Sequence, residues 1–539
     1  MKQAALVDPT TIKITFDFDW DTVAEVKTIP GRRFNNSNGK PHWTCPLSID
    51  ACQILLDSNF SFDWPLVQAF EMIRKPIPKE ADVVAAEVGE LKKDLFDFQK
   101  KGVALIEARN GRALLGDEMG LGKTIQALAW LQMHPDKRPA VIICPAHLKL
   151  NWAKEIKDTL PGNQNVQVLF GSPGNNSQLS ADIIIVNYDI LHKGWDALLD
   201  KIKPQVAIID EAHYIKSNKA LRTKATKKLV KKIPHVIALT GTPIVNRPIE
   251  AFNIIQILNP TLFPNFWSYV HTYCGAKHTG FGWDFNGATN KEELHQKLVN
   301  SIMIRRLKKD VLKDLPDKLY SYVPIQITNN KEYQQAEMDF IEYVRARKGK
   351  VAAEKAKGAE HLAKIELLKQ LSVKGKMKDA IKWVEDFIED NGKLVIFTTH
   401  KQTIDDLMNV FKDIAVKIDG PVTAQNRQAA VEKFQSDDAT RLFIGNIQAA
   451  GTGITLTAAS AVAFLELPWT SGDLSQAEDR CHRIGQKDSV NVYYLLADNT
   501  IEQEIAELLD SKRKVLNAIL DGGELEEVNL LTDLMKRYE

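Results

Sequence analysis

A glycine-rich turn between an apolar run and a helical stretch is the strongest chemical signal in the sequence. Residues 116–124 read GDEMGLGKT and follow the apolar run 113–115. Bare N–H groups at a helix N-terminus bind phosphate, and glycines let the chain approach it closely. In this pattern Lys123 faces the β- and γ-phosphates, and the Thr124 hydroxyl can hold Mg²⁺. The usual spacing has glycine where this chain has Asp117, so an ordinary glycine-rich turn remains the alternative.

Two acidic residues end a second apolar run. Residues 206–209 lead into Asp210 and Glu211. Carboxylates at a strand end can supply one ligand for Mg²⁺ and one group that orients or deprotonates water. An isolated pair is normally a solvated strand end, but Lys123 on the same predicted sheet favours nucleotide chemistry.

Two further segments carry possible chemistry. LTGTP at 239–243 ends another strand, and QAEDRCHRIGQ spans 476–486. Arg480 and Arg483 are three residues apart, which predicts one helix face. Arginines from a second domain can stabilise charge on a transferring phosphoryl group, although a surface salt-bridge face is the alternative.

The elements that must position these residues follow an α/β pattern. Continuous β-branched runs, typical of strands covered on both faces, alternate with helical segments. They lie at 140–144, 183–186, 206–209 and 236–239, and again at 394–397, 442–444, 462–465 and 490–496. Residues 250–375 between them are mostly helical, with one strand at 320–327. The sequence therefore predicts two α/β sheets separated by a helical region.

Composition narrows the class of protein. The 539 residues are 44% hydrophobic, which is typical of globular chains. Lys and Arg total 70 against 69 for Asp and Glu, so a global attraction to nucleic acid is excluded, while a local basic patch is not. No apolar run approaches the ~20 residues of a membrane span, and the N-terminus lacks a secretory signal. Five scattered cysteines do not form a disulfide framework, and packing is favoured over zinc for them.

Residues 1–75 form a separate small unit in this interpretation. Alternating apolar residues from Ile12 to Trp20 predict a strand, followed by a helix after Asp21. An Asn-Gly turn at 38–39 predicts a hairpin. Ser48 is expected to cap the next helix, and 75–80 is a Pro-rich linker.

Taken in order, these motifs resemble one known family. DEMGLGKT, DEAH, LTGTP and QAEDRCHRIGQ are similar to those of the Swi/Snf-type ATPases of helicase superfamily two, whose own pattern has aspartate at position 117. The resemblance covers about 90–510. Other matching segments are Phe98-Gln99 with Gly102-Val103, Cys144-Pro145 with Asn151-Trp152, Asn187-Tyr188, 302–318 and 451–459.

The resemblance implies two RecA-like P-loop lobes with helical insertions after a small α+β domain. The implied parts are a HARP-like domain at 1–75, lobe one at 76–255, helical protrusions and linker at 256–375, lobe two at 376–500, and a brace helix and tail at 501–539. ATP and Mg²⁺ are the implied cofactors.

Residue roles are implied in the same way. The nucleotide site would contain Gln99 on the adenine edge, with Asp117, Glu118, Met119, Gly120, Leu121, Gly122, Lys123 and Thr124. The catalytic set would be Lys123, Asp210, Glu211 as base, and Arg480 and Arg483 as arginine fingers; Thr124 and Asp210 would bind the metal. Residues coupling nucleotide state to DNA would be His213, Thr240, Thr242 and Gln476. DNA contacts would be Asn187, Tyr188, Thr398, His400, Gly451 and Thr452.

Two features resemble the annealing-helicase, or HARP-type, subgroup. Ala449-Ala450-Gly451 replaces the paired glycines usual in the family. Arg33, Lys40 and Trp43 on the predicted hairpin resemble its DNA-structure-sensing domain, although Trp43 could simply be core. Eight Lys and Arg residues between 216 and 232 could track phosphate, but a solvated helix face is the favoured interpretation.

The expected function is an ATP-dependent translocase on double-stranded DNA that remodels or reanneals branched or forked DNA. A monomeric motor is expected, cytoplasmic and nucleoid-associated in a prokaryote or virus and nuclear in a eukaryote. The alternatives are a chromatin-remodeller-like remover of DNA-bound proteins, a non-catalytic DNA-binding scaffold, and a strand-separating helicase.

Overall fold

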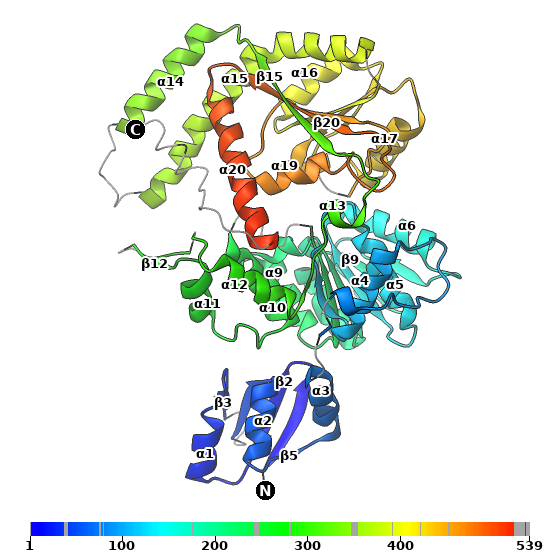
Figure 1. Cartoon of the computed structure of the whole chain (residues 1–539), viewed down its shortest axis with the longest axis vertical. Helices are drawn as coiled ribbons and strands as arrows, with labels where there is room; N and C mark the ends of the chain where they lie inside the picture. Colours follow the sequence, from blue (N-terminus) through cyan, green and yellow to red (C-terminus); the bar gives the residue numbers. More distant parts are fainter. Residues whose placement is uncertain are drawn as a thin grey trace. The chain divides into compact units, whose positions relative to one another are not determined.

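A computed structural model describes most of the chain. The described residues are 2–36, 41–74, 77–78, 80–174, 177–241, 247–279, 282–285, 287–345, 354–390, 392–420, 422–450, 453–521 and 534. The chain divides into two compact units, Met1–Leu307 and Lys308–Glu539. We describe each unit by itself (Figure 1).

Unit 1 begins with a small five-stranded sheet of order β3-β4-β2-β1-β5. Its elements are β1 (Gln3–Asp8), β2 (Thr11–Thr15), α1 (Trp20–Val26), β3 (Arg33–Asn35), β4 (His42–Pro46), α2 (Ile49–Asp57), β5 (Ser61–Phe62) and α3 (Trp64–Arg74). The predicted hairpin arms pair, with Phe34 opposite Trp43, and the Ser48 side chain accepts from Ala51 N as expected. The Asn-Gly turn lies outside the described residues.

The strand predicted to run to Trp20 is shorter than expected. β2 ends at Thr15, because Asp19 caps α1 through a bond from Thr22 N and so fixes Trp20 as the first helical residue. Phe18 and Trp20 are consequently exposed and contact each other edge to face, with ring centroids 5.2 Å apart.

The large sheet of unit 1 has seven parallel strands in the order β14-β6-β11-β10-β7-β9-β8. Its strands are β6 (Arg112–Leu115), β7 (Ala140–Cys144), β8 (Val166–Val168), β9 (Ile183–Asn187), β10 (Val206–Asp210), β11 (His235–Leu239) and β14 (Met303–Ile304). Its helices are α4 (Asp97–Ala108), α5 (Lys123–Met133), α6 (Lys149–Thr159), α7 (Tyr188–Ile190), α8 (Asp196–Lys201), α9 (Leu221–Val230) and α10 (Phe252–Leu258). The apolar residues of β7, β9, β10 and β11 are buried on both faces, as their continuous runs predict, whereas those of the edge strand β8 are half-buried. Parallel pairing brings the carboxyl ends of β6, β10 and β11 to one edge, where the acidic and glycine-rich motifs follow.

An insertion precedes β14. It consists of α11 (Phe266–Tyr273), β12 (Lys277–His278), β13 (Trp283–Asp284) and α12 (Lys291–Val299). The stretch 256–375, expected to be helical protrusions, thus also supplies β14 to the unit 1 sheet and, as described next, a strand to the unit 2 sheet.

Unit 2 contains a second parallel sheet, of order β15-β20-β19-β16-β18-β17. Its strands are β15 (Lys318–Ile325), β16 (Leu394–Thr398), β17 (Ala415–Ile418), β18 (Leu442–Asn446), β19 (Ala461–Phe464) and β20 (Val490–Ala497). Its helices are α13 (Lys308–Val311), α14 (Asn330–Arg345), α15 (Glu354–Asp390), α16 (Lys401–Phe411), α17 (Ala424–Ser436), α18 (Ile447–Ala450), α19 (Ser471–Glu478) and α20 (Ile501–Asp521).

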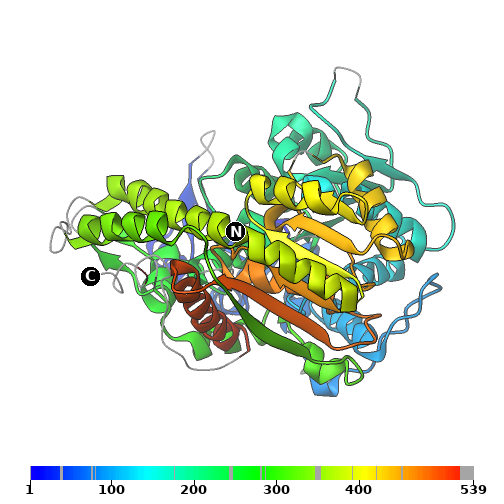
Figure 2. The ribbon, with the colours of Figure 1, turned by 90° about the horizontal axis from the view of Figure 1, so that it is seen from above.

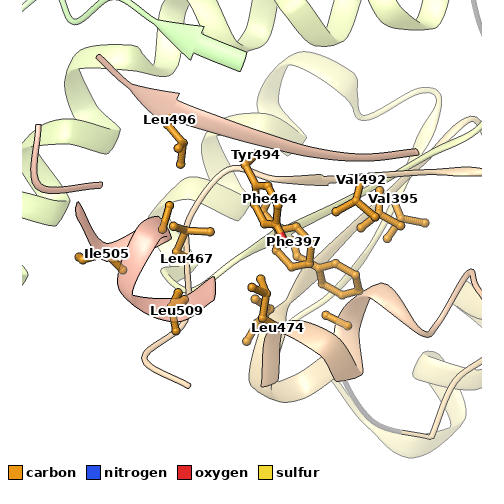
Figure 3. Close-up of a cluster of buried hydrophobic side chains, with 14 of the residues drawn as sticks. Val395, Phe397, Phe464, Leu467, Leu474, Val492, Tyr494, Leu496, Ile505 and Leu509 are labelled. Atoms are coloured by element: carbon orange, nitrogen blue, oxygen red, sulfur yellow. The ribbon is translucent and has the colours of Figure 1, made fainter. Parts of the chain in front are cut away.

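Alternate strand residues of this sheet enter two hydrophobic clusters. Leu394 and Ile396 pack with residues of α15 and α16, two helices that Figure 2 shows side by side over the sheet. Val395 and Phe397 join the opposite cluster, which includes Leu474 of α19 and Ile505 of α20 (Figure 3). α20 therefore packs within unit 2; its expected bracing role between the lobes stays a prediction. Among the described residues, no helix is long and apolar enough to cross a membrane.

Candidate active site

The glycine-rich loop joins β6 to α5 at the carboxyl edge of the unit 1 sheet. Gly122 is the N-cap of α5 and adopts φ 74°, a left-handed conformation that favours glycine. A Cβ there would lie 2.4 Å from the Gln99 amide nitrogen, so this close approach also requires glycine. The loop thus has the form of a phosphate cradle at a helix N-terminus.

Asp117 explains the departure from the usual glycine pattern. Its carboxylate is fully buried and accepts bonds from the Arg306 backbone N at 3.1 Å and Nε at 2.9 Å. Gln126 Nε2 donates to the same carboxylate at 3.0 Å, and Arg306 Nη2 also contacts it. A Cβ on Gly102 would collide with the Arg306 guanidinium at 2.5 Å. Asp117 therefore anchors the loop to Arg306, a role that the sequence motif alone did not reveal.

Lys123 lies on the carbonyls of its own loop. Its Nζ donates to Asp117 O at 2.8 Å and to Glu118 O at 3.3 Å. Burial lowers the pKa of Lys123, while the charges of Glu211, Asp117 and Asp210 act in the opposite direction. The ammonium group is thus within the electrostatic reach of the carboxylate pair on β10. Thr124, the proposed metal ligand, is the second residue of α5 and is half-buried.

The carboxylate pair is positioned by neighbouring elements. Asp210 Oδ2 accepts from the Trp152 indole at 2.7 Å and Oδ1 from Glu211 N at 2.9 Å. Glu211 adopts φ 49°, which turns the chain sharply at the end of β10. Burial first, and the charge of Glu211 second, raise the pKa of Asp210 to about 7. Trp152 was recognised in the sequence only as part of a matching segment; the structure gives it this contact.

A histidine connects the pair to the next strand. His213 Nδ1 lies 3.3 Å from Glu211 Oε2 and 3.2 Å from the Thr240 hydroxyl, just past β11. The expected role of His213 and Thr240 in coupling nucleotide state to DNA stays a prediction. Thr242 lies outside the described residues.

Both amide atoms of the Gln99 side chain bond within the protein. Its amide oxygen accepts from Phe96 N at 3.0 Å, and its Nε2 donates to Leu121 O at 3.1 Å. The side chain is buried and ties the start of α4 to the glycine-rich loop. Adenine recognition by Gln99 stays a prediction.

The two arginines of unit 2 lie in a turn and not on a helix. The prediction of a shared helix face is wrong, because α19 ends at Glu478 and Asp479 is its C-cap. Both nevertheless contact the same segment: Arg480 Nη1 donates to Ile454 O at 3.4 Å, and Arg483 Nη1 donates to the same oxygen at 3.0 Å and to the Thr455 hydroxyl at 2.7 Å. We call residues 479–483 the arginine loop.

The proposed DNA contacts are less favourably placed than expected. Asn187 and Tyr188 are buried, and the Tyr188 hydroxyl donates to Asp210 O at 2.7 Å, which supports the carboxylate strand. Thr398 is also buried, with its hydroxyl bonded to Glu466 at 2.6 Å. His400 is bracketed by Glu366 at 2.6 Å and Glu466 at 2.5 Å. Buried side chains that already bond within the protein are poorly suited to phosphate contact. Gly451, Thr452 and Lys40 lie outside the described residues.

On the small N-terminal sheet, Arg33 and Phe34 are exposed, while Trp43 packs partly against the core. The Phe34 and Trp43 rings lie 5.2 Å apart. The exposed neighbours of Trp43 favour a DNA contact, and its own packing favours a role in the core. Cys45 and Cys52 are buried without a disulfide, and the described residues contain no group of three or more potential metal-ligating side chains.

The basic run at 216–232 forms a solvated and ion-paired face. Lys228 lies 3.0 Å from Asp196, Lys232 2.7 Å from Asp200. Leu229 and Ala225 of α9 are buried, as expected for its inner side. This arrangement favours the interpretation of an ordinary helix surface over a phosphate track.

Comparison with known proteins agrees with this geometry. Residues 98–377 match the SNF2-related domain and 375–485 the helicase conserved C-terminal domain. The "SWI/SNF-related matrix-associated actin-dependent regulator of chromatin subfamily A-like protein 1 homolog" of Caenorhabditis elegans is 36% identical over 94% of this chain and 74% of its own length. The chain belongs to the SNF2-related family. The resemblance to Swi/Snf-type ATPases and the expected fold, two RecA-like lobes with an α+β domain before them, are confirmed.

Other relatives are longer. The mouse "DNA annealing helicase and endonuclease ZRANB3" is 36% identical over 80% of this chain and 41% of that protein. The Xenopus tropicalis SWI/SNF-related subfamily A-like protein 1 is 34% identical over 87% of this chain and 50% of that protein. The chain thus spans about half, or less, of these relatives. The solved "Sulfolobus solfataricus SWI2/SNF2 ATPase core in complex with dsDNA" is 27% identical, with a TM-score of 0.40, and covers 82% of this chain and 96% of that one.

Proposed function

We propose that this protein is an ATP-dependent double-stranded DNA translocase that remodels or reanneals branched or forked DNA. The observation that carries the proposal is the meeting of phosphate loop and carboxylate pair at one edge of the unit 1 sheet. Lys123 and Asp210 extend from separate strand ends, yet each influences the titration of the other. A lysine, a helix N-terminus and two carboxylates in one place are the parts that phosphoryl transfer from a nucleotide needs.

The residues present suit ATP with Mg²⁺. Carboxylate and hydroxyl oxygens are the ligands that Mg²⁺ prefers, and it commonly binds one or two carboxylates together with substrate phosphates. We assign Asp210 and Thr124 as its ligands and Lys123 to the β- and γ-phosphates. When bound, Mg²⁺ would neutralise charge on the transferring phosphoryl group. The raised pKa of Asp210 supports this assignment, because burial and the like charge of Glu211 both oppose the ionised carboxylate, which a bound cation would stabilise.

Glu211 is the proposed base. Its carboxylate follows the proposed metal ligand directly, and it would orient a water and accept its proton. His213 contacts both that carboxylate and the Thr240 hydroxyl just past β11. Movement at the end of β11 would therefore change the position of the Glu211 carboxylate. Arg480 and Arg483 are the proposed arginine fingers.

DNA is the proposed partner. Two relatives carry the name DNA annealing helicase, which supports the reannealing of DNA strands; forked or branched DNA is our proposal for the substrate. The proposed location is that of the DNA, which is the nucleoid in a prokaryote and the nucleus in a eukaryote. Removal of DNA-bound proteins is a second candidate, because other relatives are named regulators of chromatin.

The test is ATP hydrolysis by the full chain with forked, duplex and single-stranded DNA as activators. We expect forked DNA to stimulate ATP hydrolysis most. The Lys123→Ala variant should hydrolyse no ATP with any of the three. A chain that binds DNA but hydrolyses no ATP under any condition would be a scaffold, and the proposal would be wrong. Displacement of a labelled strand from a partial duplex would instead indicate a strand-separating helicase.

Fork preference is assigned to the N-terminal sheet. Arg33→Ala with Phe34→Ala in the full chain removes an exposed basic and aromatic pair of the kind that binds phosphate and stacks on bases. Phe34 is preferred to Trp43 for this test because Trp43 contributes to the core. Phe18→Ala, at an aromatic residue that is 74% exposed on the same domain, is the control. Unchanged preference for forks in the double variant would place structure sensing elsewhere.

A further inference from the structure

The short segment 305–308 contains the boundary between the two units. Arg306 belongs to unit 1 and Lys308 to unit 2, with only Leu307 between them. Both basic side chains are buried, at 4% exposure each. Burying a charge is costly unless it is paired, so each is expected to have a specific partner.

On the unit 1 side, the partner is the glycine-rich loop. Arg306 contacts Asp117 through its backbone N, Nε and Nη2, and Gln126 Oε1 through Nη2 at 2.7 Å. Arg305 adds a bond to Gly116 O at 2.9 Å. The loop thus depends on the segment at both Gly116 and Asp117.

On the unit 2 side, the partner is the arginine loop. Lys308 Nζ lies 2.8 Å from Asp479 Oδ1 and donates to His482 O at 2.6 Å. Lys318 Nζ lies 2.7 Å from the same Asp479 oxygen and 2.9 Å from Glu478 Oε2. These bonds hold the residues on both sides of Arg480.

His482 completes the attachment. Burial, and then the charge of Lys308, lower its pKa to about 4, so the ring is neutral at pH 7. Its Nε2 lies 2.7 Å from Pro316 O and must carry the proton, while Nδ1, 3.3 Å from Lys308 Nζ, accepts. Lys308, Pro316 and Lys318 thus each contact the arginine loop, through Asp479 and His482 and not through Arg480 or Arg483.

The geometry points to residues 305–308 as a connector whose two ends are each fixed to one catalytic loop: Arg306 positions the glycine-rich loop through Asp117, and Lys308 positions the arginine loop through Asp479. Lys308 and Asp479 are positioning residues, because they act through Arg480 and Arg483. The inference rests on the proposed function, in which those arginines act on the transferring phosphoryl group.

Substitutions at Arg306 and at Lys308 should affect different steps of the reaction. Arg306→Met loosens the phosphate cradle and should weaken nucleotide binding. Lys308→Met leaves the cradle intact but frees the arginine loop, so kcat per bound nucleotide should fall by about 10²-fold, the cost of a small misplacement of a catalytic group. ADP with aluminium fluoride, a mimic of the transferring phosphoryl group, should lose affinity for Lys308→Met while ADP alone does not.

Two controls separate positioning from folding. Lys376→Met breaks another buried ion pair of unit 2, with Glu502 at 2.5 Å, and should lower thermal stability without changing kcat per bound nucleotide. Lys309→Met, at the exposed neighbour of Lys308, should change neither thermal stability nor kcat per bound nucleotide.

A double-mutant cycle tests the Lys308 partner. Lys308→Met with Asp479→Asn should lose less than the sum of the two single losses, because each variant removes the shared Lys308–Asp479 ion pair. Unchanged kcat and unchanged ADP–aluminium fluoride affinity in Lys308→Met would overturn the inference, provided that the unaltered chain hydrolyses ATP on DNA and Arg480→Ala does not. If the unaltered chain does not hydrolyse ATP, the proposed function fails and the inference fails with it.

Discussion

Both large sheets carry a carboxylate at or just past the carboxyl end of a central strand, but the surrounding protein shifts the pKa values of the two carboxylates in opposite directions. In unit 1, β10 ends at Asp210, whose pKa is raised to about 7. In unit 2, Glu466 follows β19 by two residues, and its pKa is lowered to about 2. The same architecture thus holds one carboxylate that resists ionisation and one that is firmly ionised.

The surrounding donors explain the difference. Burial raises the pKa of Glu466, but His400 and the hydroxyls of Thr398 and Thr399 more than offset it. For Asp210, burial and the like charge of Glu211 both raise the pKa, and the Trp152 indole, the Glu211 amide and the charge of Lys123 only partly offset them. A carboxylate whose charge is satisfied by the protein stabilises the fold. A buried pair whose like charges oppose each other is suited to bind a cation.

If Glu466 is structural, the chemistry of unit 2 must come from its arginines. Arg480→Ala should lower kcat by roughly 10³-fold or more, because an arginine finger acts mainly on the transition state. Nucleotide affinity should change little. Measuring kcat and the Kd for ATP separately checks this, and a loss confined to Kd would make Arg480 a ground-state binder or a support of the fold. Arg483→Ala should behave in the same way.

The corresponding prediction for unit 1 concerns the base. Glu211→Gln should bind ATP normally but hydrolyse it about 10²- to 10⁴-fold more slowly, because an amide cannot accept the proton. Single-turnover hydrolysis on DNA gives the rate of the chemical step. Normal hydrolysis by this variant would remove Glu211 from the role of base, and the contrast with Glu466 would lose its meaning.

Much of this contrast was predictable from local sequence. The apolar runs fixed the strands, and parallel pairing placed 116–124 and Asp210 at one edge. The sequence also predicted the Ser48 cap, because capping depends on residues within one turn.

Contacts between distant residues were not predictable in the same way. Arg306 reaches Asp117 from 189 positions away, and His400 reaches Glu466 from 66 positions away. Motif matching assigned Tyr188 and Thr398 to DNA, but burial decides what a hydroxyl can reach, and burial is a property of the whole fold. The arginine helix was predicted wrongly because spacing of three does not reveal where a helix ends.

Removing the charge of Glu466 should destabilise unit 2. The folded pKa of about 2 lies below the ordinary 4.5, so the stabilisation is present above pH 4.5 and is lost as the pH falls towards 2. Glu466→Gln should therefore lower the free energy of unfolding by on the order of 3 kcal/mol at pH 7. Thermal unfolding of the unaltered chain and of Glu466→Gln across pH measures the difference in stability, which should become smaller below pH 4.5. A gap that does not depend on pH would show that packing, and not charge, is what the glutamate contributes.

Removing the charge of Asp210 should do the reverse. Its folded pKa of about 7 exceeds the ordinary 3.8, so the charge of Asp210 destabilises the folded state. This destabilisation is absent below pH 3.8, grows between pH 3.8 and pH 7, and is complete above pH 7. Asp210→Asn should thus raise the stability of the nucleotide-free chain at pH 8 by about 1–2 kcal/mol, a modest gain because Glu211 shares the titration. The Trp152 indole can still donate to the amide oxygen, whereas the amide nitrogen cannot accept from Glu211 N, so the gain in stability is reduced by one lost hydrogen bond. Thermal unfolding without Mg²⁺ at pH 5 and pH 8 provides the measurement, with Asn151→Ala, beside Trp152 but without a charge, as the control. A loss of stability at pH 8 would mean that unit 1 satisfies its carboxylate as fully as unit 2 does, and Asp210 would then lack the charge imbalance that makes it a cation ligand.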